Sequence, residues 1–420
     1  MTTLTTMTSA PGRRTDRVTR RSRLTTGLAM AAVVSLVAVG CGSSKSTSSN
    51  GTGAPKTPGG TAQQSVGAGE GQLDIIAWAG YAENGSNDPA VNWVSKFETD
   101  SGCKVNVKTG NTSDEMVQLM KTGQYDGVSA SGDATLRLVA GGDVAPVNTD
   151  LVPNYQDISP FLKMTQYNSA DGQAFGIPHG WGANLLMWNP AVVTTPPDSW
   201  SAVFDPNSPY KGKITAYDSP IYIADAALYL MKTQPDLGIK NPFALNQAQF
   251  DASVALLKTQ KPLVGEYWAD YLKAADAFEK GSTVLGTTWQ VIANTIEAAQ
   301  PGTVKTVLPV EGATAWSDTW MVSSKAKHPN CMYKWMDYIT SPSVQAQVAE
   351  YFGEAPANPK ACGLTTDKQH CTVFHATDAA FADQLHYWTT PTRACLDGSG
   401  KTDCLDYQQW TQAWNDLRAS

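Results

Sequence analysis

The sequence lacks the residues and motifs that mark most enzyme classes. Only five of its 420 residues are histidine. It contains neither a G-x-S-x-G nucleophile elbow nor an H-E-x-x-H zinc motif. Gly400-Lys401-Thr402 has the form of the end of a phosphate-binding loop, but Cys395 stands where that motif needs its first glycine. We therefore expect no catalytic residue, no bound metal and no cofactor.

Basic residues are scarce outside the first 40 positions. Those positions hold six of the 31 basic residues and one of the 38 acidic ones, so residues 41–420 contain 25 and 37, a net charge of −12. Such a surface repels phosphate backbones, which argues against nucleic acid as a partner. Hydrophobic residues make up 42% of the chain, which is enough for a folded core, and the length favours two domains or lobes.

A long apolar run is absent after residue 40. Before it, an arginine-rich segment at 13–23 leads into a short apolar run from Leu28 to Val39, which is the layout of a secretory signal. Thr19–Leu24 partly matches a twin-arginine export signal, so that route and the general route both stay open. Ala38–Cys41 resembles the lipobox of bacterial lipoproteins, in which the cysteine becomes the N-terminus and carries lipid. The alternative is an ordinary signal peptide that contains a cysteine.

Residues 41–72 are almost entirely small or polar. Such a segment cannot bury enough apolar surface to offset its chain entropy. We expect a flexible tether that holds a folded body away from a membrane surface. With the signal, it predicts an exported protein anchored through lipid on Cys41 to the outer face of the cell membrane, in an extracellular or periplasmic location.

Six further cysteines follow Cys41, and an even number is typical of exported proteins with disulfides. Two local pairs each enclose eight residues of polar loop, and two cysteines then remain as a long-range pair. The predicted disulfides are Cys362–Cys371, Cys395–Cys404 and Cys103–Cys331. Two cysteines and two histidines crowd together between residues 362 and 375, but they lack the paired spacing of a zinc site.

Alternating strand and helix patterns predict an α/β fold. Three short apolar strands lie between residues 73 and 128, with amphipathic helices between them, and this spacing is typical of a parallel sheet with right-handed crossovers. Ligands of such sheets bind beyond the carboxyl ends of the strands, which places Trp78–Tyr81 and Ser129–Asp133 at one rim. The second half of the chain has the same texture without an internal repeat.

Aromatic residues stand next to carboxylates at several predicted loops and strand ends. These segments are Trp78–Glu83, Glu266–Tyr271, Trp289, Trp316–Trp320 and His386–Trp388. Aromatic faces attract cations, and carboxylates complement ammonium groups. Any one of these aromatics is more simply explained as core packing, but the set favours a binding cleft on an exported, two-lobed chain.

Several segments, in order, resemble the spermidine/putrescine-binding group of ABC-importer solute-binding proteins. They are Leu73–Tyr81, Tyr125–Ser131, Phe175–Asn184, Thr288–Gln290, Leu308–Trp320, Ser341-Pro342 and Gly353–Asn358. The resemblance implies two α/β lobes, each a parallel or mixed sheet flanked by helices, with a hinge that lets them close over the ligand. It also implies a small solute and an ABC permease with its ATPase as partners, and no catalysis.

The resemblance also implies the ligand-binding residues, which are Trp78, Tyr81, Ser129, Ser131, Asp218, Trp268, Trp289 and Glu354. The aromatic members would line the cleft, and Asp218 would pair with a ligand amine. Members of the group that bind polyamines carry a second acid three residues further on, where this chain has Ile221. Glu354 stands where several members have an aromatic residue, so we expect a carboxylate to have moved to another wall of the cleft.

We therefore predict a monomeric, lipid-anchored receptor that captures a polyamine such as putrescine or spermidine in an interlobe cleft. A sugar, an opine or an amino-acid-like solute is the alternative ligand. An exported cell-wall hydrolase and a structural lipoprotein are the alternatives of another class. The expected boundaries are 1–40 for the signal, 41–72 for the tether, 73–181 with 288–356 for the first lobe, and 182–287 with 357–420 for the second.

Overall fold

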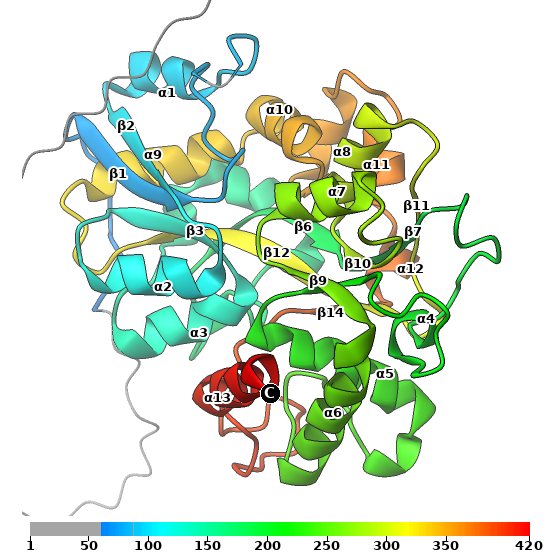
Figure 1. The fold of residues 1–420 in the computed structure, drawn as a ribbon. Coiled ribbons are helices and arrows are strands. Elements are labelled where there is room, and N and C mark those ends of the chain that lie inside the picture. The colour runs from blue at the N-terminus through cyan, green and yellow to red at the C-terminus, as the bar shows by residue number, and fades with distance from the viewer. Residues whose placement is uncertain (1–59, 87) are drawn as a thin grey trace, which may run out of the picture. The chain divides into compact units, whose positions relative to one another are not determined.

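The structure is a computed structural model that describes residues 60–86 and 88–420 (Figure 1). The predicted signal peptide, the twin-arginine and lipobox motifs, Cys41 and the tether up to residue 59 lie outside the described residues. Two large sheets and their flanking helices make up the folded body. None of the helices in the described ranges combines the length and apolarity needed to cross a bilayer.

The first sheet has seven strands in the order β13-β6-β12-β3-β1-β2, with β14 paired to β12. Its strands are β1 Gln72–Ala77, β2 Lys104–Thr109, β3 Gly127–Ser131, β6 Ile177–Ala183, β12 Ala313–Val322, β13 Ala355–Pro356 and β14 Leu385–Tyr387. Strands β1, β2 and β3 are parallel, as the alternating pattern predicted. Because β12 runs antiparallel to β3 and β6, the sheet is mixed.

The second sheet has five strands in the order β11-β7-β10-β8-β9. They are β7 Leu185–Trp188, β8 Ile214–Tyr217, β9 Val264–Trp268, β10 Leu285–Thr288 and β11 Lys305–Val307. A separate hairpin joins β4 Ser169–Ala170 to β5 Gln173–Ala174. Strands β8, β9 and β10 are parallel, so their carboxyl ends lie at the same edge.

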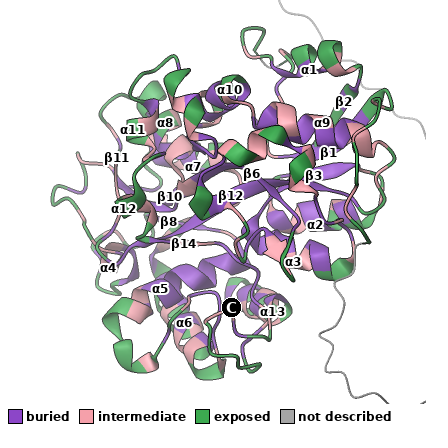
Figure 2. Cartoon of the chain, turned by 180° about the vertical axis from the view of Figure 1, so that it is seen from behind, coloured by how far each residue is buried: buried purple, intermediate pink, exposed green. Residues whose placement is uncertain are grey.

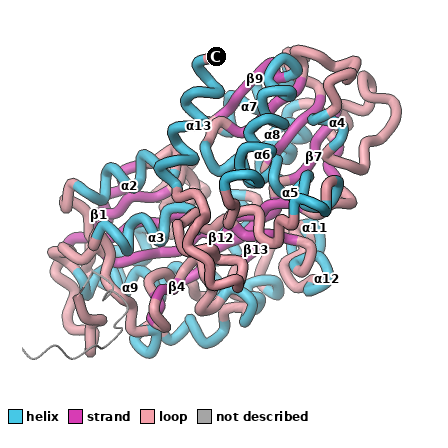
Figure 3. The backbone as a smooth tube through the Cα atoms, turned by 90° about the horizontal axis from the view of Figure 1, so that it is seen from below, coloured by secondary structure: helices cyan, strands magenta, loops and turns pink. Residues whose placement is uncertain are grey.

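Helices cover both faces of each sheet (Figures 1 and 3). In the first sheet, α2 and α3 lie on one face and α9 on the other; in the second, α5 and α6 lie opposite α7 and α8. Most strands are buried, although the edge strands β2 and β11 are largely exposed or half-buried, and the other exposed residues lie mainly on the outer helices and loops (Figure 2). The helices are α1 Val94–Ser101, α2 Ser113–Lys121, α3 Gly132–Gly141, α4 Ser201–Phe204, α5 Ile223–Thr233, α6 Gln247–Gln260, α7 Tyr271–Glu279, α8 Gln290–Ala299, α9 Pro329–Ile339, α10 Pro342–Phe352, α11 His370–Val373, α12 Ala379–Ala382 and α13 Tyr407–Ala419.

The chain passes between the sheets at short connections. It leaves the first sheet at Asn184, between β6 and β7, close to the predicted lobe boundary at residues 181 and 182. The return lies at residues 308–312, whereas the sequence placed it at Thr288–Gln290, because β11 still pairs with β7 of the second sheet. Strand β14 then pairs with β12 of the first sheet. The lobe boundaries stay a prediction. The pairing of β11 with β7 moves the expected return to the first lobe to residues 308–312, and the pairing of β14 with β12 adds residues 385–387 to the first sheet.

Residues next to the helix ends show how some of these helices begin and end. Gly102 ends α1 in the left-handed conformation at φ 70°, as expected for a glycine cap. Helix α1 begins at Val94, and Asp88, upstream of it, accepts a hydrogen bond from the N–H of Ala90 in a separate turn. Helix α9 begins at Pro329, and the side chain of Asn330 accepts a hydrogen bond from the N–H of Gly67.

Three disulfides join the pairs predicted from spacing. Cys103–Cys331 ties the residue before β2 to α9 across 228 residues of sequence. Nearby, Glu70 accepts hydrogen bonds from the N–H groups of Asn330 and Cys331, which fixes the segment before β1 against the first turn of α9. The folded body therefore begins before Gln72, and part of the predicted tether packs against it.

Candidate ligand-binding site

Four tryptophans line a small cavity of about 20 Å³ between the strand ends of the two sheets. We call it the tryptophan chamber; its lining is Trp78, Ser131, Trp289, Trp316, Asp318, Phe352 and Trp388. Aromatic faces attract cations, most strongly when both are shielded from water. The lining therefore combines several aromatic rings with one carboxylate.

Both sheets contribute to the chamber. Trp78 directly follows β1, and Trp316 and Asp318 lie on β12, all in the first sheet. Trp289 directly follows β10 in the second sheet, and its ring centroid lies 6.4 Å from that of Trp78. The site thus lies beyond strand ends, where ligands of α/β sheets bind, and it closes only where the two sheets meet.

Trp289 is the centre of the aromatic array. Its ring centroid lies 6.5 Å from the rings of both Trp316 and Trp388, and 4.9 Å from that of Trp268, with steep interplanar angles. Trp316 fits because residue 182 is glycine: a Cβ there would lie 2.6 Å from its ring. Edge-to-face packing of this kind holds the rings in place.

Asp318 supplies the charge of the chamber. Its Oδ1 accepts a hydrogen bond from the Ser131 hydroxyl, in the strand pairing that sets these two residues opposite each other, and its Oδ2 accepts one at 2.6 Å from Tyr81. Burial raises its pKa to about 6, and the two hydrogen bonds oppose that rise. At neutral pH the group is therefore mostly a carboxylate, buried without a cationic partner among the described residues.

A wider cavity of about 330 Å³ adjoins the chamber and shares Trp78, Trp289 and Phe352 with it. Its further lining comes from Gly110 and Asn111 after β2 and from residues 269–272 at the start of α7. Asp270 is part of that wall and accepts a hydrogen bond from the N–H of Leu272. A solute can thus place one end in the chamber and the rest of its length in this outer cavity.

Tyr81 and Glu354 lie behind the chamber rather than in its lining. Both are buried, and the Tyr81 hydroxyl lies 2.7 Å from Glu354 Oε2. Burial raises the pKa of Glu354 well above its usual range. The Nε2 atom of His179 lies 3.8 Å from Glu354 Oε1, but burial lowers the His179 pKa to about 3, so the imidazole is neutral and the contact is no ion pair.

Of the other predicted ligand-binding residues, some line the chamber and some are buried outside its lining. Trp78, Trp289 and Ser131 line the chamber as expected. Trp268 is buried behind Trp289 and does not belong to the chamber lining. Ser129 is buried on β3 two residues before Ser131, and its hydroxyl has no partner among the described residues.

Asp218 lies away from the chamber lining. Its carboxylate pairs with Arg418 of α13 at 3.2 Å and accepts a hydrogen bond from the indole of Trp414 at 3.1 Å. The Arg418 guanidinium also lies 3.9 Å from the centre of the Tyr267 ring. The resemblance assigned the Asp218 carboxylate to a ligand amine. In the structure Arg418 of the same chain pairs with it, because helix α13 packs there.

Asp318, Trp316, Trp388 and Phe352 are the chamber residues that the predicted site omitted. The sequence held a signal for three of them, since two aromatic–acid segments include residues 316–320 and 386–388. What it did not contain was the pairing of β12 with β3, which sets Asp318 opposite Ser131.

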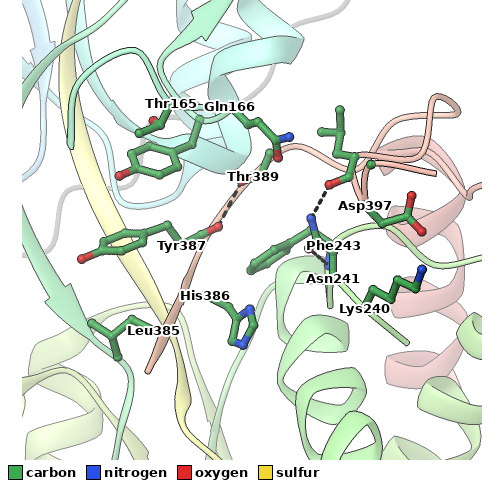
Figure 4. Close-up of a pocket in the computed structure, with 13 residues that line it drawn as sticks. Thr165, Gln166, Lys240, Asn241, Phe243, Leu385, His386, Tyr387, Thr389 and Asp397 are labelled. Carbon is green, nitrogen blue, oxygen red and sulfur yellow. Dashed lines mark hydrogen bonds between the residues drawn. The ribbon is translucent and has the colours of Figure 1, made fainter. Parts of the chain in front are cut away.

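A third cavity, of about 480 Å³, lies beside β14 and the Cys395–Cys404 loop (Figure 4). Asn241 donates a hydrogen bond across it to the carbonyl of Leu396. Lys240 and Asp397 line one side, and the ring of Tyr387 points away from them. A wide lining that carries its own lysine is poorly suited to a small cationic solute.

Two groups of side chains in the described ranges have the proximity of metal ligands, and neither is free to bind one. Cys395 and Cys404 form a disulfide. In the other group, the carboxylate oxygens of Asp126 accept hydrogen bonds from the backbone N–H groups of Asp74, Lys327 and His328. One of these oxygens also lies 2.8 Å from Nδ1 of the His328 ring. Asp126 therefore links loops of the first sheet.

Two α/β lobes with a walled cavity between their strand ends define the two-lobed fold of periplasmic binding proteins. In a solved example, the spermidine/putrescine ABC transporter substrate-binding protein PotD from Streptococcus pneumoniae, the fold matches with a TM-score of 0.64 at 18% identity, over 83% of this chain and 97% of that one. Residues 92–369 match the family described as bacterial extracellular solute-binding protein, and the chain belongs to that family.

The sequence relatives carry polyamine names. The putrescine-binding periplasmic protein SpuD of Pseudomonas aeruginosa is 24% identical over 307 residues, which cover 68% of this chain and 79% of SpuD. The spermidine/putrescine-binding periplasmic protein of Escherichia coli is 24% identical over 301 residues, 69% of this chain and 82% of that protein. The chain is accordingly a substrate-binding component of an ABC importer.

Proposed function

We propose that this chain captures a small cationic, nitrogen-containing solute, with a polyamine such as putrescine or spermidine as the first candidate. The observation that carries the proposal is the buried Asp318 carboxylate inside the tryptophan chamber. A buried carboxylate is costly unless a cation pairs with it, and an ammonium group would supply both the charge and the hydrogen-bond donors. The names of the sequence relatives support the same class of solute.

The two cavities suit a linear amine. The chamber has room for one ammonium head, and the outer cavity continues from it along Trp78 and Trp289. Asp270 in the outer wall offers a second carboxylate for a distant amine of a diamine or triamine. We propose that binding holds the solute for delivery to a permease with its ATPase, without chemical change.

An opine or amino-acid-like solute with a single cationic nitrogen is the second candidate. It is favoured because the chamber contains one carboxylate, while Asp218 is already paired with Arg418. A neutral sugar fits less well, since it leaves the charge of Asp318 without a partner.

Tryptophan fluorescence and calorimetry test the proposal, because a solute in the chamber touches several indoles. We expect putrescine and spermidine to bind and change the emission, and a neutral sugar such as glucose to do neither. Binding of an ω-amino acid with no response to either polyamine would favour the second candidate. A response to the sugar alone would contradict both.

We also propose that the protein is exported, tethered to the outer face of the cell membrane through lipid on Cys41, and monomeric. The arginine-rich and apolar segments before Cys41 and the small residues after it support this proposal. Detergent-phase partitioning of the wild type and of Cys41→Ala tests it: the variant should move to the aqueous phase. Equal partitioning of the two proteins would contradict a lipid anchor at this residue.

A further inference from the structure

Behind the chamber, one phenol is placed between two carboxyl groups. The Tyr81 oxygen lies 2.6 Å from Asp318 Oδ2 and 2.7 Å from Glu354 Oε2, and all three side chains are buried. A phenol carries one proton and can donate it to one acceptor at a time. Two short contacts to carboxyl oxygens therefore require a second proton, held by one of the two acids.

The surroundings decide which acid holds it. Asp318 accepts hydrogen bonds from both Ser131 and Tyr81, and two donors stabilise the anion. Tyr81 is the hydrogen-bond partner of the Glu354 side chain, and the neutral His179 is too far away to donate. The Glu354 carboxyl also lies flat against Gly180, where a Cβ would come within 2.1 Å of it. Glu354 is thus the acid with less to stabilise a charge.

We propose that Glu354 is a neutral carboxylic acid that donates its proton to the Tyr81 oxygen, so that Tyr81 donates to Asp318 and the chamber presents a single negative charge. Glu354 is then a positioning residue that acts on the ligand through Tyr81 and Asp318. In this proposal Glu354 does not itself bind the ligand, in contrast to its predicted role as a ligand carboxylate. The arrangement selects a solute that places one cationic group in the chamber, and this consequence rests on the proposed function.

The titratable groups around the array agree with this assignment. Burial raises the pKa of Glu354 most, and the neighbouring charge of Asp318 raises it further; burial also raises the pKa of Asp318, with a smaller contribution from Asp133 at the start of α3, but the hydrogen bonds from Ser131 and Tyr81 oppose that rise. His179 on β6 is uncharged, and His370 on α11 contacts the Glu354 backbone carbonyl rather than its carboxyl. Neighbouring negative charge and burial both oppose a second anion beside Asp318.

Infrared spectroscopy of the solute-free wild type tests the proton directly. At about pH 8.5 the buried acids whose pKa lies near 6 or 7, Asp133, Asp225 and Asp318, are ionised, whereas a protonated Glu354 still shows the C=O stretch of a carboxylic acid. We expect one such band in the wild type and none in Glu354→Gln. If the Gln variant does not fold, Tyr81→Phe must shift the band, because it removes the acceptor of the acid proton. A wild type with no acid band, or a band that stays in Glu354→Gln, would overturn the proposal.

Binding of putrescine gives the second readout. Glu354→Ala should weaken it about 10-fold, because Tyr81 loses its partner, and Glu354→Gln should restore it, since the amide also donates to the phenol oxygen. A loss in Glu354→Gln as large as in Glu354→Ala would contradict a neutral Glu354. If putrescine binds neither the wild type nor any variant, the proposed function fails, while the infrared result still decides where the proton is.

Discussion

Asp318 and Asp218 both lie among aromatic side chains, but they differ in what balances their charge. Asp218 is partly exposed on the second-sheet side and is paired with Arg418, whose guanidinium lies over Tyr267. Asp318 is buried, with hydroxyl donors and the tryptophans of the chamber around it and no cation of the described chain beside it. The difference teaches that an aromatic–acid cluster does not by itself define a ligand site: at Asp218 the chain supplies the cation, whereas at Asp318 the proposed function assigns it to a solute.

Replacing Asp318 should have the largest effect on putrescine affinity. Asp318→Asn keeps the size of the side chain but removes its charge. We expect putrescine affinity to fall about 30-fold or more, since truncating one partner of a buried charge pair costs roughly 2–5 kcal/mol. Isothermal titration calorimetry measures it, with Asp218→Asn as the matched control. Equal losses in the two variants would erase the distinction between the two sites.

Replacing Trp289 of the tryptophan chamber should have the next largest effect on putrescine affinity. Trp289→Ala removes the ring that joins the two sheets at the chamber, and we expect putrescine affinity to fall about 10-fold to 100-fold through lost cation–π attraction and contact. Trp414→Phe, beside Asp218, is the control and should leave the affinity within about twofold of wild type. If Trp414→Phe weakens binding as much as Trp289→Ala, the solute binds near Asp218 instead.

Acid should weaken putrescine binding through Asp318. Because the pKa of Asp318 is raised to about 6, lowering the pH through that value neutralises the carboxylate, and putrescine affinity should fall by up to about tenfold per pH unit. The stability of the solute-free protein has the opposite sign. A raised pKa contributes stability that is present below the ordinary value of 3.8 and is lost as the pH rises through about 6.

Calorimetry between about pH 5 and pH 8 checks this dependence, and Asp318→Asn should remove it. Affinity that is constant across the range in the wild type would contradict an ionising carboxylate in the chamber.

The smallest effect is expected at Asp218. Asp218→Asn should leave putrescine affinity within about twofold and lower Tm by about 1–3 °C, because a partly exposed ion pair is worth roughly 0–1 kcal/mol. Arg418→Gln removes the same pair from the other side and should lower Tm equally. Thermal unfolding of both variants measures it. A large loss of affinity in Asp218→Asn with no change in Arg418→Gln would return Asp218 to the ligand site.

Much of the fold could be predicted from the sequence. The β1, β2 and β3 strands follow from short apolar runs, and two of the disulfides follow from the local spacing of their cysteines, whereas Cys103–Cys331 follows only as the pair that remains. The chamber could be predicted only in part. Trp78, Trp289 and Ser131 stand at strand ends and carry a local signal. Asp318 reaches the chamber through its register with β3, and Asp218 is covered by a helix almost 200 residues further along the chain. Neither relation is visible in a local pattern.

The same limit explains Glu354. A carboxylate near predicted cleft aromatics reads as a ligand contact, yet its state depends on Tyr81 and on burial, which only the fold determines.

The most direct test of the account is a crystal structure of the protein with saturating putrescine. We predict density for the solute in the tryptophan chamber, with a nitrogen atom within hydrogen-bonding distance of the Asp318 carboxylate and the pair between Asp218 and Arg418 intact. Density beside Asp218 with Arg418 displaced, or in the cavity of Figure 4 with an empty chamber, would contradict the account.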